Sequence, residues 1–413
     1  MPAEEATRLV HMTTVPLTLW SFLGGQVGYM KSRGFEVHAL SSPGDLLDAF
    51  AERESVPVHA VAMSRRITPL RDLRALLRLY FLLRQLRPAI VHAHTPKGGL
   101  LGMIASWLAG VPVRIYQVHG LPMMAATGPK RLAMRWSDRV ACLLAHRVVC
   151  VSRSVRQVAV AEGLCPARKA KVLLEGTING VDASVRFDPA RLDPRARAET
   201  RLRLGIPEGS PVVGFVGRLA RDKGLVELLG AWKLLLGTHP DLHLLVVGPT
   251  EREDPLPTDV ETTLRGEPRI HLTGPVADTP PLFAAMDVLA LPSYREGFGQ
   301  VLLEAAAMRL PTVASRIAGC SDAVLDGKTG TLVPPRDAVA LAGAIRNYLD
   351  DPALRLRHGR AGRERVTLEF RQEDIWAVME REYRLLLIQS KVQRCGFLNW
   401  NLASKSRPEE IPL

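Results

Sequence analysis

Short apolar runs alternate with longer amphipathic segments along the first 190 residues. The short runs are rich in β-branched residues, which is typical of strands buried in a parallel sheet. The longer segments repeat apolar residues at helical spacing. This alternation predicts an α/β fold. The predicted strands are Leu9–Thr14, Glu36–Leu40, Ala89–His92, Val113–Val118, Arg147–Val151 and Lys171–Leu174, and the predicted helices are Gly25–Arg33, Pro69–Leu86, Gly99–Leu108, Pro129–Ala145 and Arg153–Glu162.

A second alternating series begins after an Arg- and Pro-rich stretch, which we interpret as a connection between domains. Its predicted strands are Val212–Val216, Leu242–Val247, Ile270–Leu272, Val288–Leu291, Thr312–Ala314 and Gly330–Val333, with helices at Gly224–Leu236 and Ala338–Asp350. Two Rossmann-like domains facing across a cleft are the simplest architecture, with ligands at the carboxyl ends of the strands. The predicted boundaries are 1–186 for the N-terminal domain, 187–209 for the linker, 210–368 for the C-terminal domain, 369–388 for a helix that packs back on the first domain, and 389–413 for an irregular tail.

Charge is distributed unevenly along the 413 residues. Residues 1–190 hold 24 Lys and Arg against 13 Asp and Glu, whereas residues 191–413 hold 30 against 29. A basic half indicates an anionic partner, such as nucleic acid, a membrane surface or a diphosphate-bearing acceptor. No zinc-finger spacing or aromatic RNA-binding signature accompanies the charge, so we expect a membrane surface and no nucleic acid.

The cysteines and the N-terminus indicate a reducing compartment. The five Cys show neither a Cys-x-x-Cys nor a metal-ligand spacing, so they read as small buried hydrophobes. Residues 1–7 carry two acids and no basic segment, so no signal peptide is expected. The uncharged and strongly apolar run Gly98–Val113 is shorter than the ~20 residues that span a bilayer.

Two glutamates, Glu296 and Glu304, stand eight residues apart around Gly297-Phe298-Gly299. The glycine loop follows an apolar strand and runs into a helix of strong helix formers. Glu296 lies on the loop, where free backbone N–H groups gather. Backbone donors beside two carboxylates can hold an anionic leaving group together with sugar and ribose hydroxyls. The alternative interpretation is a loop–helix junction with two solvated acids.

A second candidate site, Gly217-Arg218 with Lys223, lies between the first strand of the second series and a helix. Gly217 lets the backbone approach a ligand closely. Arg218 offers a planar fork for two phosphate oxygens, and Lys223 adds a mobile point charge. The set suits a diphosphate, although basic surface turns are common in proteins.

With these motifs the chain resembles the retaining glycosyltransferases of the GT-B fold, in family 4 with its E-x7-E motif, over nearly all of residues 9–388. The N-terminal half is similar to the branch that builds bacterial polysaccharides and lipid-linked glycans. Two positions differ from the family pattern: Arg309 stands where glycine is frequent, and Asp322 where glutamate is frequent. Further matching segments are Phe22-Leu23-Gly24-Gly25, Val91-His92-Ala93-His94-Thr95-Pro96, Val118-His119-Gly120, Gly319, Asp326-Gly327 and Gly330.

The resemblance implies that the N-terminal domain, 1–186, binds the acceptor and that the C-terminal domain, 210–368, binds the nucleotide sugar. It also implies a role for each matching residue. Arg218 and Lys223, beside Gly217, would hold the donor diphosphate, and Glu304 would bind the ribose. The donor sugar would be held by Glu296 and the amides of Gly297, Phe298 and Gly299, and His119 would hydrogen-bond that sugar near the reacting carbon. The phosphates would be covered by Gly24 and Gly25. The base would be contacted by Pro275 and Val276. We therefore take His119, Arg218, Lys223 and Glu296 as the catalytic set.

The histidines are open to more than one interpretation. By position alone, His119 is as compatible with a structural role as with a functional one. His92 and His94 share one strand face, where a metal pair is conceivable. No third ligand has a suitable spacing and the resemblance implies no metal, so we interpret His94 as lining the cleft on the acceptor side and His92 as structural. No cofactor is expected.

The implied reaction moves a hexose or N-acetylhexosamine from a nucleotide diphosphate sugar, expected to be UDP-linked, to a glycan or undecaprenyl-diphosphate-linked acceptor with retention. A phosphorylase, a nucleotide-sugar epimerase and a non-catalytic nucleotide-sugar-binding homologue share this architecture and remain alternatives. A dinucleotide oxidoreductase is disfavoured, because no G-x-G-x-x-G follows the first strand.

Two basic amphipathic stretches, from Arg65 to Arg87 and from Lys130 to Arg147, bear on the location. The first interpretation is that each packs an apolar stripe on a sheet. The hypothesis beside it is an edge resting on an anionic bilayer, with Trp136 as an interfacial anchor. We therefore expect a cytoplasmic protein that is peripheral at the inner face of the cell membrane.

Overall fold

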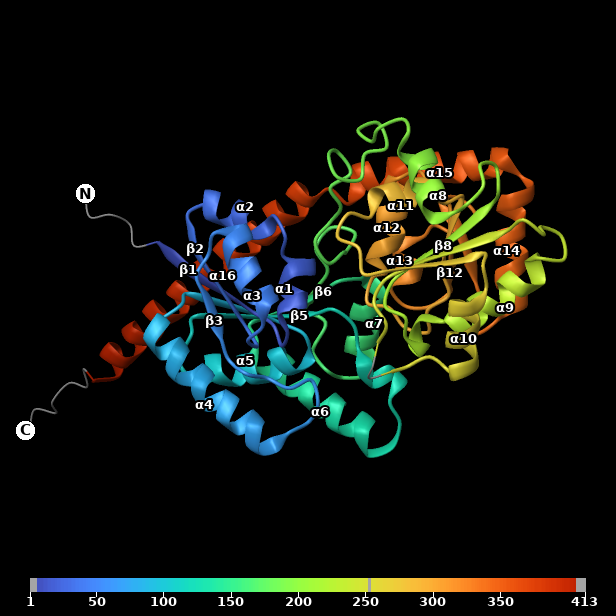
Figure 1. Cartoon of the computed structure of the whole chain (residues 1–413). Helices are drawn as coiled ribbons and strands as arrows, with labels where there is room; N and C mark the ends of the chain where they lie inside the picture. The colour runs from blue at the N-terminus through green and yellow to red at the C-terminus, as the bar shows by residue number, and fades with distance from the viewer. Residues whose placement is uncertain (1–5, 252–253, 406–413) are drawn as a thin grey trace, which may run out of the picture.

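The computed structural model describes residues 6–251 and 254–405, with side chains described through residue 392 apart from residue 125. Its N-terminal half is a parallel seven-stranded sheet in the order β3-β2-β1-β4-β5-β6-β7, flanked by helices on both faces (Figure 1). The inner strands are buried on both faces, as their β-branched composition requires, whereas the edge strand β3 is partly exposed. Its elements are β1 (Thr7–Met12), α1 (Pro16–Phe22), α2 (Gln26–Ser32), β2 (Phe35–Ser41), α3 (Asp45–Glu54), β3 (Val58–Ala60), α4 (Pro69–Leu86), β4 (Ile90–His94), α5 (Pro96–Leu108), β5 (Val113–Val118), η1 (Pro122–Ala125), α6 (Gly128–Leu144), β6 (Arg147–Cys150), α7 (Arg153–Ala161) and β7 (Ala170–Lys171).

The C-terminal half repeats the plan with a parallel six-stranded sheet in the order β10-β9-β8-β11-β12-β13. In each sheet the first strand lies between the second and a later one, so the strand order reverses there and the carboxyl ends open a ligand site. The expected pair of Rossmann-like domains is confirmed. The elements are α8 (Ala196–Leu204), β8 (Val212–Val216), η2 (Arg221–Lys223), α9 (Leu225–Leu235), β9 (His243–Val247), α10 (Thr258–Gly266), β10 (Ile270–Gly274), α11 (Pro280–Ala285), β11 (Val288–Leu291), α12 (Gln300–Ala307), β12 (Thr312–Ser315), α13 (Cys320–Ala323), β13 (Gly330–Val333), α14 (Ala338–Asp350), α15 (Pro352–Glu369) and α16 (Gln372–Lys405).

Helix α16 returns from the C-terminal half and lies along the N-terminal one (Figure 1). Its Met379, Tyr383 and Leu386 belong to the apolar cluster formed around β1, β2 and α2. Glu380 accepts hydrogen bonds from Tyr29 and Arg33. The C-terminal helix is therefore part of the N-terminal core.

The prediction of an irregular tail from residue 389 is wrong for residues 389–405, which continue α16. A segment without apolar periodicity has no face to bury, but this alone does not end a helix. No proline interrupts the segment before Pro408, and most of its residues are tolerated in helices. Residues 406–413 lie outside the described part of the chain.

Helices α4 and α6 each pack an apolar face on the sheet, as expected, but each also exposes a second set of apolar side chains. In α4 the buried residues are Ala75, Leu79 and Leu83. The exposed ones are, with their exposed fractions, Leu70 (77%), Leu73 (54%), Leu77 (50%) and Phe81 (66%) in α4, and Leu132 (54%), Trp136 (57%) and Leu143 (73%) in α6. None of the helices within the described residues combines the length and the apolar character that crossing a bilayer requires.

Candidate active site

The carboxyl ends of the two sheets meet along a face that we call the interdomain junction. Ser152, after β6, donates from its Oγ to the backbone oxygen of Gly297, after β11, at 2.9 Å. A Cβ on Gly297 would lie 1.8 Å from the backbone oxygen of His119, so the two backbones touch where only glycine fits. The glycine loop is thereby pressed against the end of β5.

The residue that departs from the family pattern at position 322 crosses the same junction. Asp322 Oδ1 accepts from the backbone N–H groups of Arg153 and Ser154 at 3.0 and 3.2 Å. These are free N–H groups at the start of α7, where a carboxylate is favoured. Asp322 therefore acts as an interdomain cap, a role that its position in the sequence did not indicate.

Lys223 and Glu296 come together at the centre of the C-terminal side. Lys223 Nζ lies 2.6 Å from Glu296 Oε1, and Ser293 Oγ donates to the same oxygen at 2.9 Å. Both members of the ion pair are mostly buried. Glu296 Oε2 accepts no hydrogen bond from the described residues, so it is the oxygen open to a ligand hydroxyl. Sequence reasoning missed Ser293, although it stands three residues before Glu296.

Arg218 is held at the same end of the sheet by a carboxylate. Its Nη1 lies 2.5 Å from Glu251 Oε2, and its side chain is 40% exposed. Gly217 lies against Gly248, whose added Cβ would lie 1.9 Å from the Gly217 backbone oxygen. The loops after β8 and β9 are therefore packed backbone to backbone, which leaves the Arg218 guanidinium at the surface of the site.

Glu304 lies on α12, and its carboxylate has no hydrogen-bond partner among the described residues. Burial raises the pKa of Glu304 to about 7, and the charge of Arg186 lowers it in part. Phe298 is fully buried, with its ring 5.7 Å from that of Phe370, so this residue offers only its backbone to a ligand. Gly299 starts α12 with φ 63°, in the left-handed region.

The N-terminal side of the junction is made of histidines. His94 Nδ1 lies 3.0 Å from His119 Nε2, and His94 Nε2 lies 3.1 Å from His11 Nδ1. Phe22 stacks on His119 at 4.8 Å between ring centroids. Burial lowers the pKa of His119 and of His11 to about 3, and it lowers that of His94 well below its usual value. These rings are therefore neutral hydrogen-bonding groups at neutral pH.

The remaining predicted contacts lie around this centre. Gly25 begins α2 with φ 77°, and an added Cβ there would lie 2.7 Å from the Trp376 ring of α16. The backbone oxygen of Gly24 accepts from Asn179 Nδ2, whose side chain also accepts from Trp376 Nε1. Pro275 and Val276 follow β10, and Val276 is 37% exposed.

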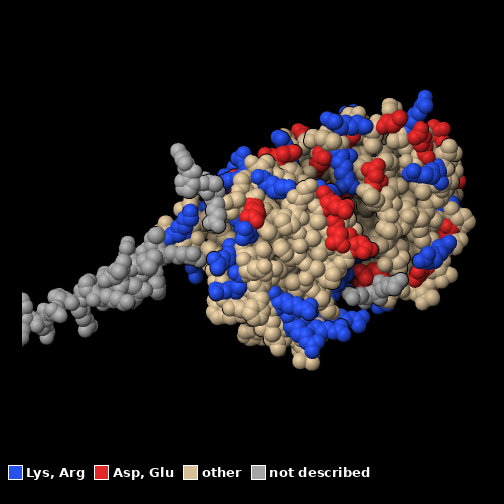
Figure 2. Space-filling view, turned by 60° about the vertical axis from the view of Figure 1, so that its left-hand side comes forward, with Lys and Arg blue, Asp and Glu red and all other residues tan. Residues whose placement is uncertain are grey.

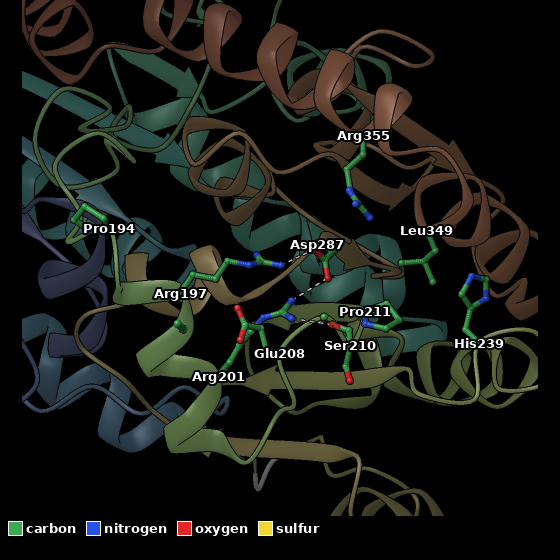
Figure 3. Close-up of a pocket in the computed structure, with 12 residues that line it drawn as sticks. Pro194, Arg197, Arg201, Glu208, Ser210, Pro211, His239, Asp287, Leu349 and Arg355 are labelled. Carbon is green, nitrogen blue, oxygen red and sulfur yellow. Dashed lines mark hydrogen bonds and ion pairs between the residues drawn. The ribbon is translucent and has the colours of Figure 1, made fainter.

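A separate cavity of about 660 Å³ lies at the other end of the C-terminal sheet (Figure 3). Asp287 and Pro211 in its lining precede β11 and β8, so the cavity opens at the amino ends of the strands. Arg197 and Arg201 of α8 extend to Asp287 at 2.8 and 3.0 Å. Their pairing with Asp287 ties much of the 187–209 stretch to the C-terminal domain. The cavity is remote from the predicted donor residues.

Comparison with known proteins matches both halves of the chain. Residues 19–174 match the glycosyl transferase 4-like domain, and residues 210–351 match the glycosyl transferases group 1. The capsular polysaccharide biosynthesis glycosyltransferase CapM of Staphylococcus aureus is 30% identical over 384 residues, which cover 93% of this chain and 98% of that one. The UDP-Gal:alpha-D-GlcNAc-diphosphoundecaprenol alpha-1,3-galactosyltransferase of Escherichia coli is 30% identical over 76% of this chain and 78% of its own.

Solved structures share the fold. A glycosyltransferase of Rickettsia africae superimposes with a TM-score of 0.75 at 20% identity, over 93% of this chain and 99% of that one. Anabaena HepE, crystallised with UDP and glucose, gives 0.74 at 22% identity over 92% and 99%. The expected GT-B fold is thereby confirmed. Since a relative of 30% identity is matched over almost its whole length, the chain belongs to the group 1, family 4-like glycosyltransferases.

Proposed function

We propose that this glycosyltransferase moves a hexose or N-acetylhexosamine from a UDP-sugar to a hydroxyl of a glycan or undecaprenyl-diphosphate-linked acceptor, with retention, in the synthesis of a cell-surface polysaccharide. The Staphylococcus relative, named for capsular polysaccharide biosynthesis, and the Escherichia relative, named for transfer to a diphosphoundecaprenol-linked sugar, support the polysaccharide and lipid-linked setting. The Anabaena structure supports UDP, because that protein was crystallised with it.

The observation that carries the proposal is the arrangement around Glu296. Lys223 and Ser293 hold one carboxylate oxygen and leave the other free among the described groups. A carboxylate fixed in this way orients a sugar hydroxyl, while the lysine beside it faces an anionic leaving group.

In the proposed reaction the bond between the anomeric carbon and the diphosphate oxygen breaks as the acceptor oxygen bonds to the same face of that carbon. The leaving phosphate oxygen takes the acceptor's proton, so no carboxylate base is required. Arg218, Lys223 and the amides of Gly297–Gly299 stabilise the charge that develops on the diphosphate. Each such donor contributes about 3 kcal/mol, or ~100-fold in rate. With this fixed charge the reaction is proposed to need no metal at the diphosphate.

The remaining donor contacts are proposed from the resemblance to the family. Glu304 takes the ribose hydroxyls, Pro275 and Val276 contact the base, and Gly24-Gly25 close over the phosphates from the N-terminal side. His119 hydrogen-bonds the donor sugar, and His94 supports the acceptor side of the junction through His119.

We further propose that α4 and α6 rest on an anionic membrane surface, which would place the enzyme at the inner face of the cell membrane. The neighbouring helix α5 contacts both. Their exposed apolar residues alternate with exposed basic ones, among them Arg71, Arg74, Arg78, Lys130 and Arg139. Lys and Arg gather along the lower edge of the molecule in Figure 2, the side on which Figure 1 places these helices. Apolar side chains among cations are the pattern of interfacial binding.

The direct test is binding and slow hydrolysis of a panel of UDP- and GDP-linked sugars by the full-length protein, compared with the Glu296→Gln variant. We expect saturable binding of one UDP-sugar and loss of hydrolysis in the variant. Full activity of Glu296→Gln would contradict its role. Glycan breakdown that depends on inorganic phosphate would indicate a phosphorylase, and absence of any donor binding a non-catalytic homologue.

A further inference from the structure

A cluster of three histidines lies beneath the N-terminal side of the junction. His11 of β1 and His92 of β4 are direct partners in the sheet register, and His94 follows two residues later on the same face of β4. All three are at most 1% exposed. One ring nitrogen from each lies within 4.8 Å of those of the other two. The sequence does not reveal His11 as the third member, because strand pairing brings it across 81 residues of chain.

Partners outside the cluster hold one nitrogen on two of these rings. His92 Nδ1 bonds Tyr383 Oη at 2.7 Å, and its buried Nε2 makes no hydrogen bond of normal geometry with the described residues, although the Gln117 side chain lies close to the ring. His94 Nδ1 bonds His119 Nε2, which turns His94 Nε2 toward His11. His11 offers either nitrogen, since Nδ1 faces His94 and Nε2 is buried without a partner among the described groups. Folded proteins rarely leave such atoms unsatisfied.

We propose that His11, His92 and His94 bind a zinc ion, with water as the fourth ligand. Three imidazoles with an open fourth position are a ligand set that zinc uses. Zinc–nitrogen bonds of ~2.0–2.1 Å place neighbouring ligand atoms about 3.4 Å apart, close to the 3.1 Å between His11 Nδ1 and His94 Nε2. Magnesium and calcium are disfavoured, because they prefer sites built from oxygen ligands and the cluster offers three imidazole nitrogens and no carboxylate.

Tyr383 and His119 then act as the outer hydrogen-bond partners that orient metal-bound histidines. A His94 ring that binds zinc through Nε2 carries its proton on Nδ1 and donates to His119 Nε2. His119 therefore keeps its own proton on Nδ1, the buried atom that has no partner among the described residues. The zinc ion thus fixes His119 as a donor toward the sugar. This last step rests on the proposed function, whereas the metal site does not.

The test is metal binding by the full-length protein, purified without a histidine tag and freed of metal with a chelator. Zinc affinity is measured by competition with a chromophoric chelator, and cobalt is used as a probe whose visible spectrum reports four-coordinate nitrogen sites. We expect one equivalent of metal, with roughly 100-fold weaker zinc binding in His11→Gln and at least ~10-fold weaker binding in Tyr383→Phe.

His243→Gln is the matched control. His243 and His271 form a comparable stacked pair in the C-terminal sheet, with ring nitrogens 2.8 Å apart and no third histidine in the described cluster. This variant should bind zinc as the wild type does. The proposal is overturned if the wild type binds no metal at micromolar concentration. It is also overturned if folded Tyr383→Phe and His11→Gln proteins, checked by circular dichroism, bind zinc as tightly as His243→Gln. Donor binding is measured separately, so loss of the proposed function would not imitate either result.

Discussion

The N-terminal half carries its surplus of positive charge on outer helices and keeps neutral imidazoles at the junction. The C-terminal half is nearly neutral in total, yet it concentrates charged side chains at the junction, as the Lys223–Glu296 and Arg218–Glu251 pairs show. The two halves therefore use charge at opposite places. Net charge of a half does not tell which side of the site binds an anion.

The difference has a physical reason. Lys223 and Arg218 are each compensated by a carboxylate, which keeps a cationic site stable before an anion arrives. His94 and His119 hydrogen-bond to each other as neutral rings. Burial disfavours their charged forms and lowers the pKa of both. A diphosphate would thus meet cations that are already paired on one side, and sugar hydroxyls would meet neutral rings on the other.

Removing a charge from the C-terminal side should have the largest effect. We expect Lys223→Ala to lower the transfer rate by ~100- to 1,000-fold, because the leaving diphosphate loses a fixed cation. Lys233→Ala is the control, since Lys233 is exposed on the outer face of α9. Steady-state kinetics with the donor identified in the panel measure both. Equal rates for the two variants would show that the charged side does not hold the diphosphate.

Separating the two sides should have the next largest effect. In Gly297→Ala the new Cβ would overlap the His119 backbone oxygen, so the halves cannot close. A displacement of about 1 Å lowers the rate by roughly 100-fold. Gly343→Ala in α14, where an added Cβ meets nothing within 4 Å, should keep full activity and gain up to about 1 kcal/mol of stability. Small-angle scattering follows closure, and an unchanged rate in a correctly folded Gly297→Ala protein would refute the contact.

Changing the pH should have an intermediate effect on donor binding, and it should arise from Glu304 on the C-terminal side. The pKa of Glu304 is raised to about 7, so its carboxylate protonates as the pH falls through 7. If the ionised form accepts the ribose hydroxyls, donor binding should be about tenfold weaker at pH 6 than at pH 8. Glu304→Gln should bind weakly with no such slope. Calorimetric titration measures donor affinity at both pH values. If Glu304→Gln shows the same pH dependence as the wild type, a group other than Glu304 is responsible.

The same group makes a stability prediction of defined sign. A carboxyl whose folded pKa exceeds its unfolded value takes up a proton on folding between pH 4.5 and 7, so its burial destabilises the protein most above pH 7. Glu304→Gln should therefore be stabilised relative to wild type by about 1 kcal/mol at pH 8, after allowance for partial exposure. At pH 5 most of that gain should disappear in thermal melts.

Removing one positive charge from the outer surface of the N-terminal half should have the smallest effect of these changes. Arg78→Gln on α4 should weaken binding to vesicles of anionic lipid by about fivefold, or ~1 kcal/mol, at low salt. Arg346→Gln on α14, exposed in the other half, should not change it. Sedimentation with vesicles measures both. If the wild-type protein does not sediment, the membrane proposal fails.

Much of the fold could be predicted from the sequence, because buried parallel strands such as Val288–Leu291 leave a continuous apolar signal between helices. Elements whose pattern is weaker were not predicted, among them α8, which is held by Arg197 and Arg201 on Asp287. Asp287 lies 86 residues from Arg201 in the sequence, so no local sequence pattern indicates the contact that holds this helix.

The candidate site shows the same difference between short sequence motifs and contacts made by residues far apart in the sequence. The loop that bears Ser293 and Glu296 and the turn that bears Lys223 are short motifs, and the structure brings them to one point. His11 was not predicted, since its relation to His94 exists only through strand register. The left-handed backbone at Arg309, with φ 62°, gives a reason why glycine is frequent at that position.

The return of α16 has a consequence for the order in which the protein is completed. Tyr383 and Met379 fill the core around β1 and β2, so the strands synthesised first lack part of their apolar partner until α16 has emerged. Domains otherwise tend to fold as they leave the ribosome, the N-terminal one first. Here the core around the C-terminal sheet consists of residues that precede α16, whereas the core of the N-terminal domain is complete only with α16.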